Sequence, residues 1–169
     1  MIYFKRKLKN FGPLEVLVIS SFLYVFIMLT WTASTRSQVI KKASDIQTNH
    51  KVVVEFINDE VNKCSSDIEA STSWGENCNS VWTSSKIVKY ILDNFKLNNP
   101  YNIKKPLVQT SQDPRTQAEG KAGQSTDKGI IFVSLNDFAS EPGSEWIVGT
   151  CVKSPCVAAG NNELVSVYR

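Results

Sequence analysis

The sequence predicts an α+β fold in which one long N-terminal α-helix packs on a small antiparallel β-sheet. Residues 16–35 carry no charge and are mostly apolar, and a helix of twenty such residues is about as long as the ~30 Å hydrocarbon core of a bilayer is thick. No Gly or Pro interrupts residues 14–73, so the same helix can continue beyond its apolar part. Short runs rich in β-branched residues near the end of the chain predict the strands.

Composition divides the chain into four parts. Residues 1–10 are a basic leader, residues 11–35 a hydrophobic membrane and assembly helix, residues 36–63 an amphipathic helical half, and residues 64–169 a globular head that holds all four cysteines. A head of this length suffices for one small domain with a modest core.

The leader and the start of the hydrophobic helix carry the charges that matter most. The leader contains Lys5, Arg6, Lys7 and Lys9 and no acid. A basic flank on this side keeps the N-terminus in the cytoplasm and sends the rest of the chain across the membrane. A single carboxylate, Glu15, stands at the entrance of the uncharged run. An acid placed there costs roughly a few kcal/mol unless it finds a partner, so Glu15 is a candidate functional residue.

The order of these features resembles the processing signal of type IV prepilins. That order is the basic leader, then Phe11-Gly12-Pro13-Leu14-Glu15, then the hydrophobic run. The stretch Thr35-Arg36-Ser37-Gln38 is similar to the polar stretch where pilin helices leave the bilayer. Two positions depart from the family's pattern: Asn10 stands where Gly or another small residue is usual, and Pro13 stands where an apolar residue is usual.

The resemblance implies processing followed by assembly. A prepilin peptidase would cleave between Asn10 and Phe11 and methylate the new N-terminal Phe11. Glu15 would then be the fifth mature residue, and its carboxylate would pair with the free amine of a neighbouring subunit, which offsets the cost of burying either charge. The subunit would wait in the bacterial inner membrane with its head in the periplasm. Inner-membrane assembly machinery would then extract it into a homo-oligomeric helical filament, an extracellular pilus.

Two other functions stay open. A pseudopilin of a type II secretion system shares the N-terminal features, although its head usually has a calcium loop in place of a C-terminal disulfide. An uncleaved single-pass anchor holding a periplasmic binding domain would keep residues 1–10 and remain in the membrane fraction. A cleaved secretory signal is disfavoured because residues 14–31 are longer than the usual hydrophobic region of such signals.

The amphipathic half shows one apolar stripe with intervals of three and four residues, typical of an α-helix. Its members are Val39, Ala43, Ile46, His50, Val53, Ile57 and Val61. Together with the apolar part it predicts one helix over residues 13–62, about 75 Å long at 1.5 Å per residue. His50 is the one histidine of the chain, and we expect it to be neutral and hydrogen-bonded beneath the sheet; the alternative is a ligand or a pH sensor.

The four cysteines fall into two local pairs, Cys64 with Cys78 and Cys151 with Cys156. Four cysteines allow three pairings, and spacing alone does not choose between them. Local pairing is the simplest expectation for a domain exported to an oxidising compartment. Neither spacing matches the closely spaced ligands of a structural zinc site, so we expect no metal. The segment that begins at Cys151 also resembles the disulfide-bounded C-terminal region of type IV pilins.

Between the cysteine pairs we expect a loop, a helix and a turn. The loop covers residues 64–79 and is closed by the first pair. The helix covers residues 80–95 and is capped by Asn79 or Ser80. Its expected inner face consists of Val81, Ser84, Ile87, Val88, Ile91, Leu92 and Phe95. Residues 98–102, Asn-Asn-Pro-Tyr-Asn, read as a turn.

The rest of the head is expected to be an exposed loop followed by the sheet. Residues 109–128 are rich in Gln, Ser, Thr, Gly and charge, which is typical of a surface loop. Residues 129–135, 145–152 and 163–168 are the predicted strands of a three- or four-stranded antiparallel sheet. Pro142-Gly143 marks the first turn between them.

Charge and motif content disfavour several other functions. The leader holds four of the nineteen basic residues, so the remaining chain has fifteen basic against sixteen acidic residues, a formal charge of −1. Bulk charge therefore gives no support to nucleic-acid binding. No nucleophile–base set, metal-ligand spacing or phosphate loop emerges, so we expect neither enzymatic activity nor a cofactor.

Overall fold

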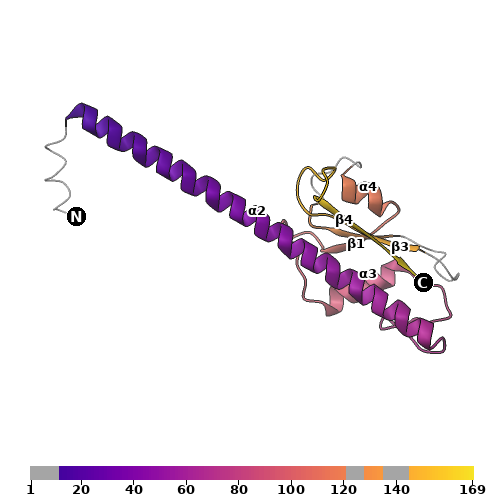
Figure 1. The fold of residues 1–169 in the computed structure, drawn as a ribbon. Helices are drawn as coiled ribbons and strands as arrows, with labels where there is room; N and C mark the ends of the chain where they lie inside the picture. The colour runs from indigo at the N-terminus through magenta and orange to yellow at the C-terminus, as the bar shows by residue number, and fades with distance from the viewer. Residues whose placement is uncertain (1–11, 121–127, 135–144) are drawn as a thin grey trace. The chain divides into compact units, whose positions relative to one another are not determined.

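Helix α2 is the element on which the fold is built. The computed structural model describes residues 12–120, 128–134 and 145–169. Within them α2 runs from Pro13 to Ser66, 54 residues (Figure 1), or about 81 Å at 1.5 Å per residue. Pro13 occupies the first helical position, where its missing N–H has no intrahelical partner to lose. The predicted helix is confirmed and ends four residues beyond residue 62.

The chain forms two compact units, residues 1–40 and residues 41–169. In the first unit, the described residues belong to α2 except for Gly12, which precedes it, and each of them is exposed. The second unit contains the rest of α2, the helices α3 and α4, and a four-stranded sheet. The α+β class, with a long helix packed on a small sheet, is confirmed.

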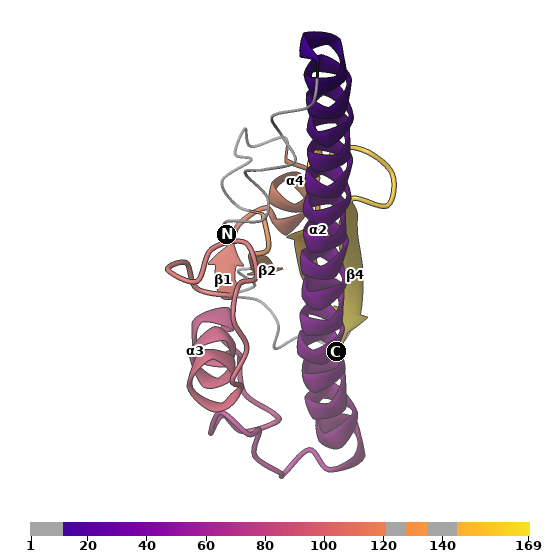
Figure 2. The same cartoon turned by 90° about the vertical axis from the view of Figure 1, so that its left-hand side faces the viewer.

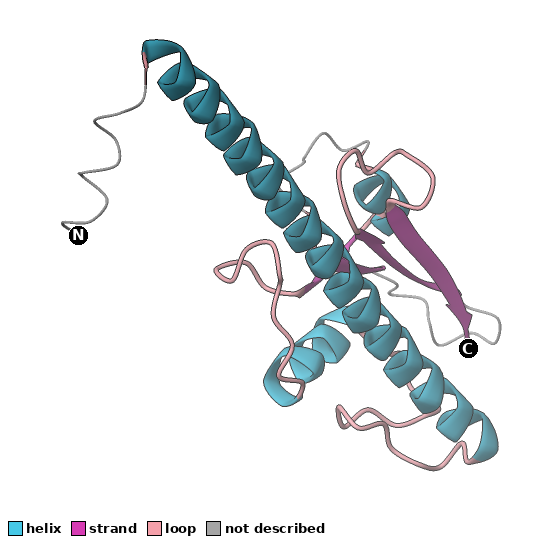
Figure 3. Ribbon diagram, turned by 60° about the vertical axis from the view of Figure 1, so that its left-hand side comes forward, coloured by secondary structure: helices cyan, strands magenta, loops and turns pink. Residues whose placement is uncertain are grey.

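The sheet, whose strands are magenta in Figure 3, has the strand order β1-β2-β3-β4. Its strands are β1 (Val108–Ser111), β2 (Ile131–Ser134), β3 (Glu145–Cys151) and β4 (Asn162–Tyr168). The pairs β2–β3 and β3–β4 are antiparallel, as predicted. The pair β1–β2 is parallel, so the sheet is mixed. The predicted turn at residues 142–143 lies outside the described residues.

The parallel pair arises in a region predicted to be an exposed loop, residues 109–128, and that prediction is wrong for residues 109–119; residues 121–127 lie outside the described residues. β1 and the short helix α4 (Pro114–Glu119) lie there. A parallel neighbour requires a crossover connection, and α4 forms part of it. The caps of α4 are visible in the sequence: the Asp113 side chain accepts a hydrogen bond from the Thr116 N–H, Pro114 starts the helix, and Gly120 ends it in the left-handed conformation.

Helices cover both faces of the sheet. One face packs on α2 and α3, and the three elements share one hydrophobic core. This core includes Ile46, Val53, Ile57, Ile87, Ile91, Val133, Trp146, Val148 and Val167. Gly149 follows Val148 and faces the other side. A Cβ on Gly149 would lie 3.0 Å from the Ala118 Cβ of α4, so α4 packs against this second face.

Helix α3 (Ser84–Asn94) lies beside the second half of α2 (Figure 2). The ring of Phe56 in α2 stacks on Tyr90 in α3 at 5.5 Å between centroids. The helix starts four residues later than predicted, with Thr83 and not Asn79 or Ser80 at its N-cap position. Trp82, two residues before the helix, is fully buried. The expected inner face holds for Ser84, Ile87, Val88 and Ile91, whereas Val81 and Leu92 are exposed.

Candidate membrane and assembly segment

The apolar first half of α2, residues 13–35, is the main candidate functional segment. Its apolar side chains are exposed all round the helix; Leu14, Phe22 and Trp31 each keep 70% or more of their surface accessible. A helix that is apolar on every side requires lipid or other helices around it. By length and composition α2 can cross a membrane, and no residue of the apolar window is buried.

Most Ser and Thr side chains of this half make their hydrogen bonds within the helix itself. The hydroxyls of five Ser and Thr residues donate to backbone carbonyls three or four positions earlier: Ser20, Ser21, Thr30, Thr32 and Thr35. Hydrocarbon offers no hydrogen-bond partner, so internal satisfaction is what a helix inside a bilayer or a helix bundle requires. These residues therefore do not oppose membrane insertion.

Glu15 lies in the first turn of α2, where it has a partner on its own chain. Its Oε2 accepts a hydrogen bond from the Gly12 N–H at 3.0 Å. Gly12 is the residue before the helix, and its carbonyl accepts from the Val16 N–H at 3.2 Å. The pattern is one half of a capping box, in which an acidic N3 side chain satisfies the N-cap amide. The negative charge is also favoured by the helix dipole at this end.

The other two residues of the processing signal cannot be placed beside Glu15. Asn10 and Phe11 lie outside the described residues, so cleavage between them stays a prediction.

The predicted stripe of the second half of α2 is confirmed from Ala43 onwards, while Val39 is exposed. His50, on the stripe, is 4% exposed, and its ring Nε2 donates to the carbonyl of Val148 at 3.2 Å. Burial lowers the pKa of His50; the hydrogen bond to Val148 and the charge of Glu163 act in the opposite direction and do not reverse the shift. The expected burial of His50 and its hydrogen bond beneath the sheet are confirmed, and the lowered pKa favours the neutral ring.

The loop after α2 is closed by the predicted Cys64–Cys78 disulfide, with 5.1 Å between the Cα atoms. Two buried carboxylates organise this loop. Glu60 accepts from the backbone N–H of Ser73 at 2.9 Å. Glu76 accepts from the Trp74 indole at 2.7 Å and from the Thr83 N–H at 3.2 Å, and pairs with Lys86 at 2.9 Å.

Glu76 contacts the start of α3 at the N-cap residue, Thr83. The Thr83 side chain makes no capping hydrogen bond, and the Glu76 carboxylate binds the Thr83 N–H at the start of α3. Sequence reasoning missed both carboxylates. For Glu60 a signal existed, because it lies three residues after Ile57 and so falls on the buried stripe. For Glu76 no local pattern indicates burial.

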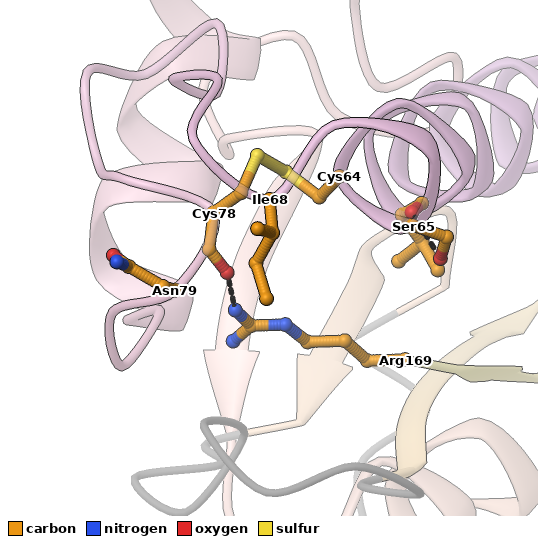
Figure 4. A pocket seen from close by; sticks show the side chains of 7 residues that line it. Cys64, Ser65, Ile68, Cys78, Asn79 and Arg169 are labelled. Carbon is orange, nitrogen blue, oxygen red and sulfur yellow. Dashed lines mark hydrogen bonds between the residues drawn. A yellow bond between two sulfur atoms is a disulfide. The ribbon is translucent and has the colours of Figure 1, made fainter.

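Arg169, directly after β4, reaches this same loop (Figure 4). Its guanidinium donates to the carbonyls of Cys78 and Ser80 and lies 4.0 Å from the ring centroid of Trp82. A shallow cavity of about 260 Å³ lies between Arg169, the disulfide and Ile68. Burial lowers the pKa of Arg169, and the charge of Glu76 opposes this shift.

The second predicted disulfide, Cys151–Cys156, follows β3 with 5.3 Å between its Cα atoms. It lies against the end of α4, because a Cβ on Gly120 would be 2.9 Å from the Cys156 Cβ. The Asn162 side chain donates to the Cys156 carbonyl at 2.6 Å and ties this loop to β4.

Among the described residues, no three His, Cys, Asp or Glu side chains come together in a group able to hold a metal ion. Comparisons of the chain with protein-family models, with curated proteins and with solved structures give no match.

Proposed function

We propose that this protein is a structural subunit of a type IV pilus, an extracellular helical filament. The observation that carries the proposal is the division of α2. Its first half exposes apolar side chains on every side and begins with one carboxylate, Glu15, while its second half is sealed beneath a sheet. A membrane-resident subunit whose helix later joins a helix bundle needs both halves.

Assembly would exchange lipid contacts for contacts between helices. The subunit waits in the inner membrane with its head in the periplasm, and the assembly machinery extracts it into the fibre. In the aqueous surroundings of the fibre, association of apolar helix faces gains about 25 cal/mol for each Å² removed from water. No catalytic step is required, and no cofactor is part of the mechanism.

Glu15 would have two successive partners. In the unassembled subunit its carboxylate binds the Gly12 N–H, so it enters the bilayer surface already hydrogen-bonded. In the fibre it would pair with the amine of Phe11 on a neighbouring subunit, which becomes free when the peptidase removes residues 1–10. Such a charged pair in a desolvated bundle fixes the axial register, since a slipped subunit leaves an unpaired charge.

A pseudopilin of a type II secretion system is the second candidate. It shares the membrane helix, and the observation that separates the two is the Cys151–Cys156 disulfide near the end of the chain, where pseudopilin heads usually have a calcium loop. The disulfide favours the pilus subunit. An uncleaved membrane-anchored binding domain is the third candidate.

The deciding experiment is the intact mass of the protein from its native host, measured both in cells and in material sheared from the cell surface. Loss of residues 1–10 with one added methyl group, in a filament that pellets, is the expected result. A chain that retains Met1 and never leaves the membrane fraction would leave only the anchored binding domain.

A further inference from the structure

Two lysines lie near the ring of Tyr101 in the head, and a third, Lys104, is close to it in sequence. The Nζ atoms of Lys42, from α2, and Lys128, just before β2, lie 5.8 Å and 5.3 Å from the centroid of the Tyr101 ring. Lys104 follows in the same turn as Tyr101. We call Lys42, Lys104 and Lys128 the lysine cluster. None of the three forms an ion pair with any residue that the structure describes.

The turn between Asn99 and Lys104 is held in one conformation. Buried Asn99 accepts from the backbone N–H groups of Tyr101 and Asn102 at 2.9 and 3.1 Å and donates to the Lys128 carbonyl at 3.3 Å. Gly129 has a φ of 76°, and a Cβ there would lie 2.6 Å from the Asn99 side chain. These contacts order the turn that carries Tyr101 and Lys104 and tie it to the backbone of Lys128, which lowers the entropy lost when a ligand binds there.

An exposed apolar side chain, Ile103, belongs to the same turn. Ile103 is 82% exposed. It stands directly before Lys104 and two residues after Tyr101 in the turn. An apolar residue flanked by cations matches a bilayer surface, where lysines meet phosphates while the apolar group enters the boundary of the acyl chains.

We propose that the lysine cluster and Ile103 bind the anionic phospholipid headgroups of the membrane that the apolar half of α2 crosses. The proposal rests on the membrane placement in the proposed function. Lys42 follows Thr35 by seven residues, so the chain keeps it within about 25 Å of the end of the membrane segment in any conformation. Each lysine at an anionic surface contributes attraction that decays within a Debye length. Docking of this surface would hold the head against the bilayer until extraction.

The test uses the full chain reconstituted in lipid nanodiscs. Hydrogen–deuterium exchange of residues 101–105 is compared between neutral phosphatidylcholine discs and discs with about 30% phosphatidylglycerol. We expect at least about fivefold slower exchange in the anionic discs, and loss of this difference in about 0.5 M NaCl. The triple variant Lys42→Gln, Lys104→Gln, Lys128→Gln should show no difference between the discs.

The matched control is Lys89→Gln, Lys96→Gln, Lys153→Gln, which changes the total charge equally at exposed lysines outside the cluster and should keep the difference. Equal exchange of the unmodified chain in both discs overturns this proposal alone. The proposal is also overturned if inorganic phosphate slows the exchange of residues 101–105 in neutral discs. It is likewise overturned if the triple variant changes only self-association, because the lysines would then bind an acidic face of a second copy. A chain that enters neither disc overturns the membrane placement and this proposal with it.

Discussion

The carboxylate of Glu15 accepts a hydrogen bond from the backbone N–H of Gly12, 3.0 Å away, at the start of α2. This contact gives Glu15 a role inside one subunit that does not depend on assembly. It also separates two properties of the side chain. The hydrogen bond needs an oxygen at this position, whereas pairing with a neighbour's amine needs the negative charge.

The first prediction uses this separation. Glu15→Gln keeps an oxygen that can accept from Gly12, since Gln also serves in capping boxes, and removes the charge. We expect normal protein levels and membrane insertion but strongly reduced filament formation in a strain that expresses only the variant. Loss of one partner of a desolvated charge pair costs about 3–5 kcal/mol. The measurement is the amount of pelletable filament sheared from cells.

The matched variant Glu15→Ala removes both the charge and the cap. If the charge matters for assembly, both variants lose filaments to a similar extent, and only Glu15→Ala frays the first turn of α2. Filaments at wild-type density in the Gln variant would show that Glu15 is a helix cap and nothing more.

The second prediction concerns pH. Because burial lowers the pKa of His50 in the folded head, the unfolded chain binds a proton more readily than the folded one. The contribution of neutral His50 to the unfolding free energy should therefore be fully present above about pH 6.5, the pKa of a free histidine. The unfolding free energy should fall as the pH drops below this value. One proton limits the slope to about 1.4 kcal/mol per pH unit.

His50→Gln is the control, since its amide can donate to the Val148 carbonyl without titrating. Urea unfolding followed by tryptophan fluorescence between about pH 5 and 8 should show the slope in the wild type and a smaller one in the variant. Equal slopes in the two proteins would assign the pH dependence to other groups.

The third prediction compares the two disulfides. Cys64–Cys78 spans 14 positions and Cys151–Cys156 spans 5. In the chain-entropy model the longer loop contributes about 3 kcal/mol and the shorter about 2 kcal/mol. The double Ser variant at 64 and 78 should thus lower the unfolding free energy more than the double Ser variant at 151 and 156. The opposite order would mean that the contacts of Cys156 with Gly120 outweigh loop entropy.

The sequence was most informative where one signal dominates. The three-and-four spacing from Ala43 to Val61 specifies a buried helical face directly, and two local cysteine pairs require no long-range information. The predicted strands were similarly visible because β-branched residues concentrate in them.

Composition failed where a segment is only partly buried. β1 contains Gln109, Thr110 and Ser111, and its polar character concealed a strand that exists because it pairs with β2. The sequence of this edge strand therefore lacked the hydrophobic pattern that predicts a strand. The buried role of Glu76 also depended on tertiary contacts, since Trp74, Thr83 and Lys86 meet it only after the loop folds.

The fourth prediction tests that buried carboxylate. Glu76→Gln removes the charge from a side chain that is 6% exposed and pairs with Lys86, and it leaves fewer acceptor sites for the Trp74 and Thr83 donors. A loss of about 1–3 kcal/mol in unfolding free energy is expected. Glu55→Gln is the matched control, because its pair with Lys51 is exposed and such helical pairs are worth about 0.3–0.5 kcal/mol. Equal losses in denaturant unfolding would place Glu76 outside the structural network.

The last prediction concerns the packing of α4 on the sheet. A Cβ added at Gly149 would lie 2.7 Å from the Leu164 side chain, 2.9 Å from the Pro114 carbonyl oxygen and 3.0 Å from the Ala118 Cβ. Leu164 can rotate, but the backbone oxygen cannot move without shifting α4. Gly149→Ala should therefore destabilise the head by about 1–3 kcal/mol through overpacking.

The second variant, Ala118→Gly, removes one of the three obstructing atoms. Ala118→Gly alone costs stability, but combined with Gly149→Ala the total loss should be smaller than the sum of the two single losses. Part of the overpacking should persist, because the Pro114 oxygen remains in place. The coupling energy from urea unfolding of the two single variants and the double variant measures this directly. If the losses of the two single variants simply add in the double variant, positions 149 and 118 do not touch. Helix α4 would then lie further from the sheet than the 3.0 Å distance between the two Cβ atoms implies. A positive coupling would fix α4 on this face and with it the crossover that makes β1 parallel to β2.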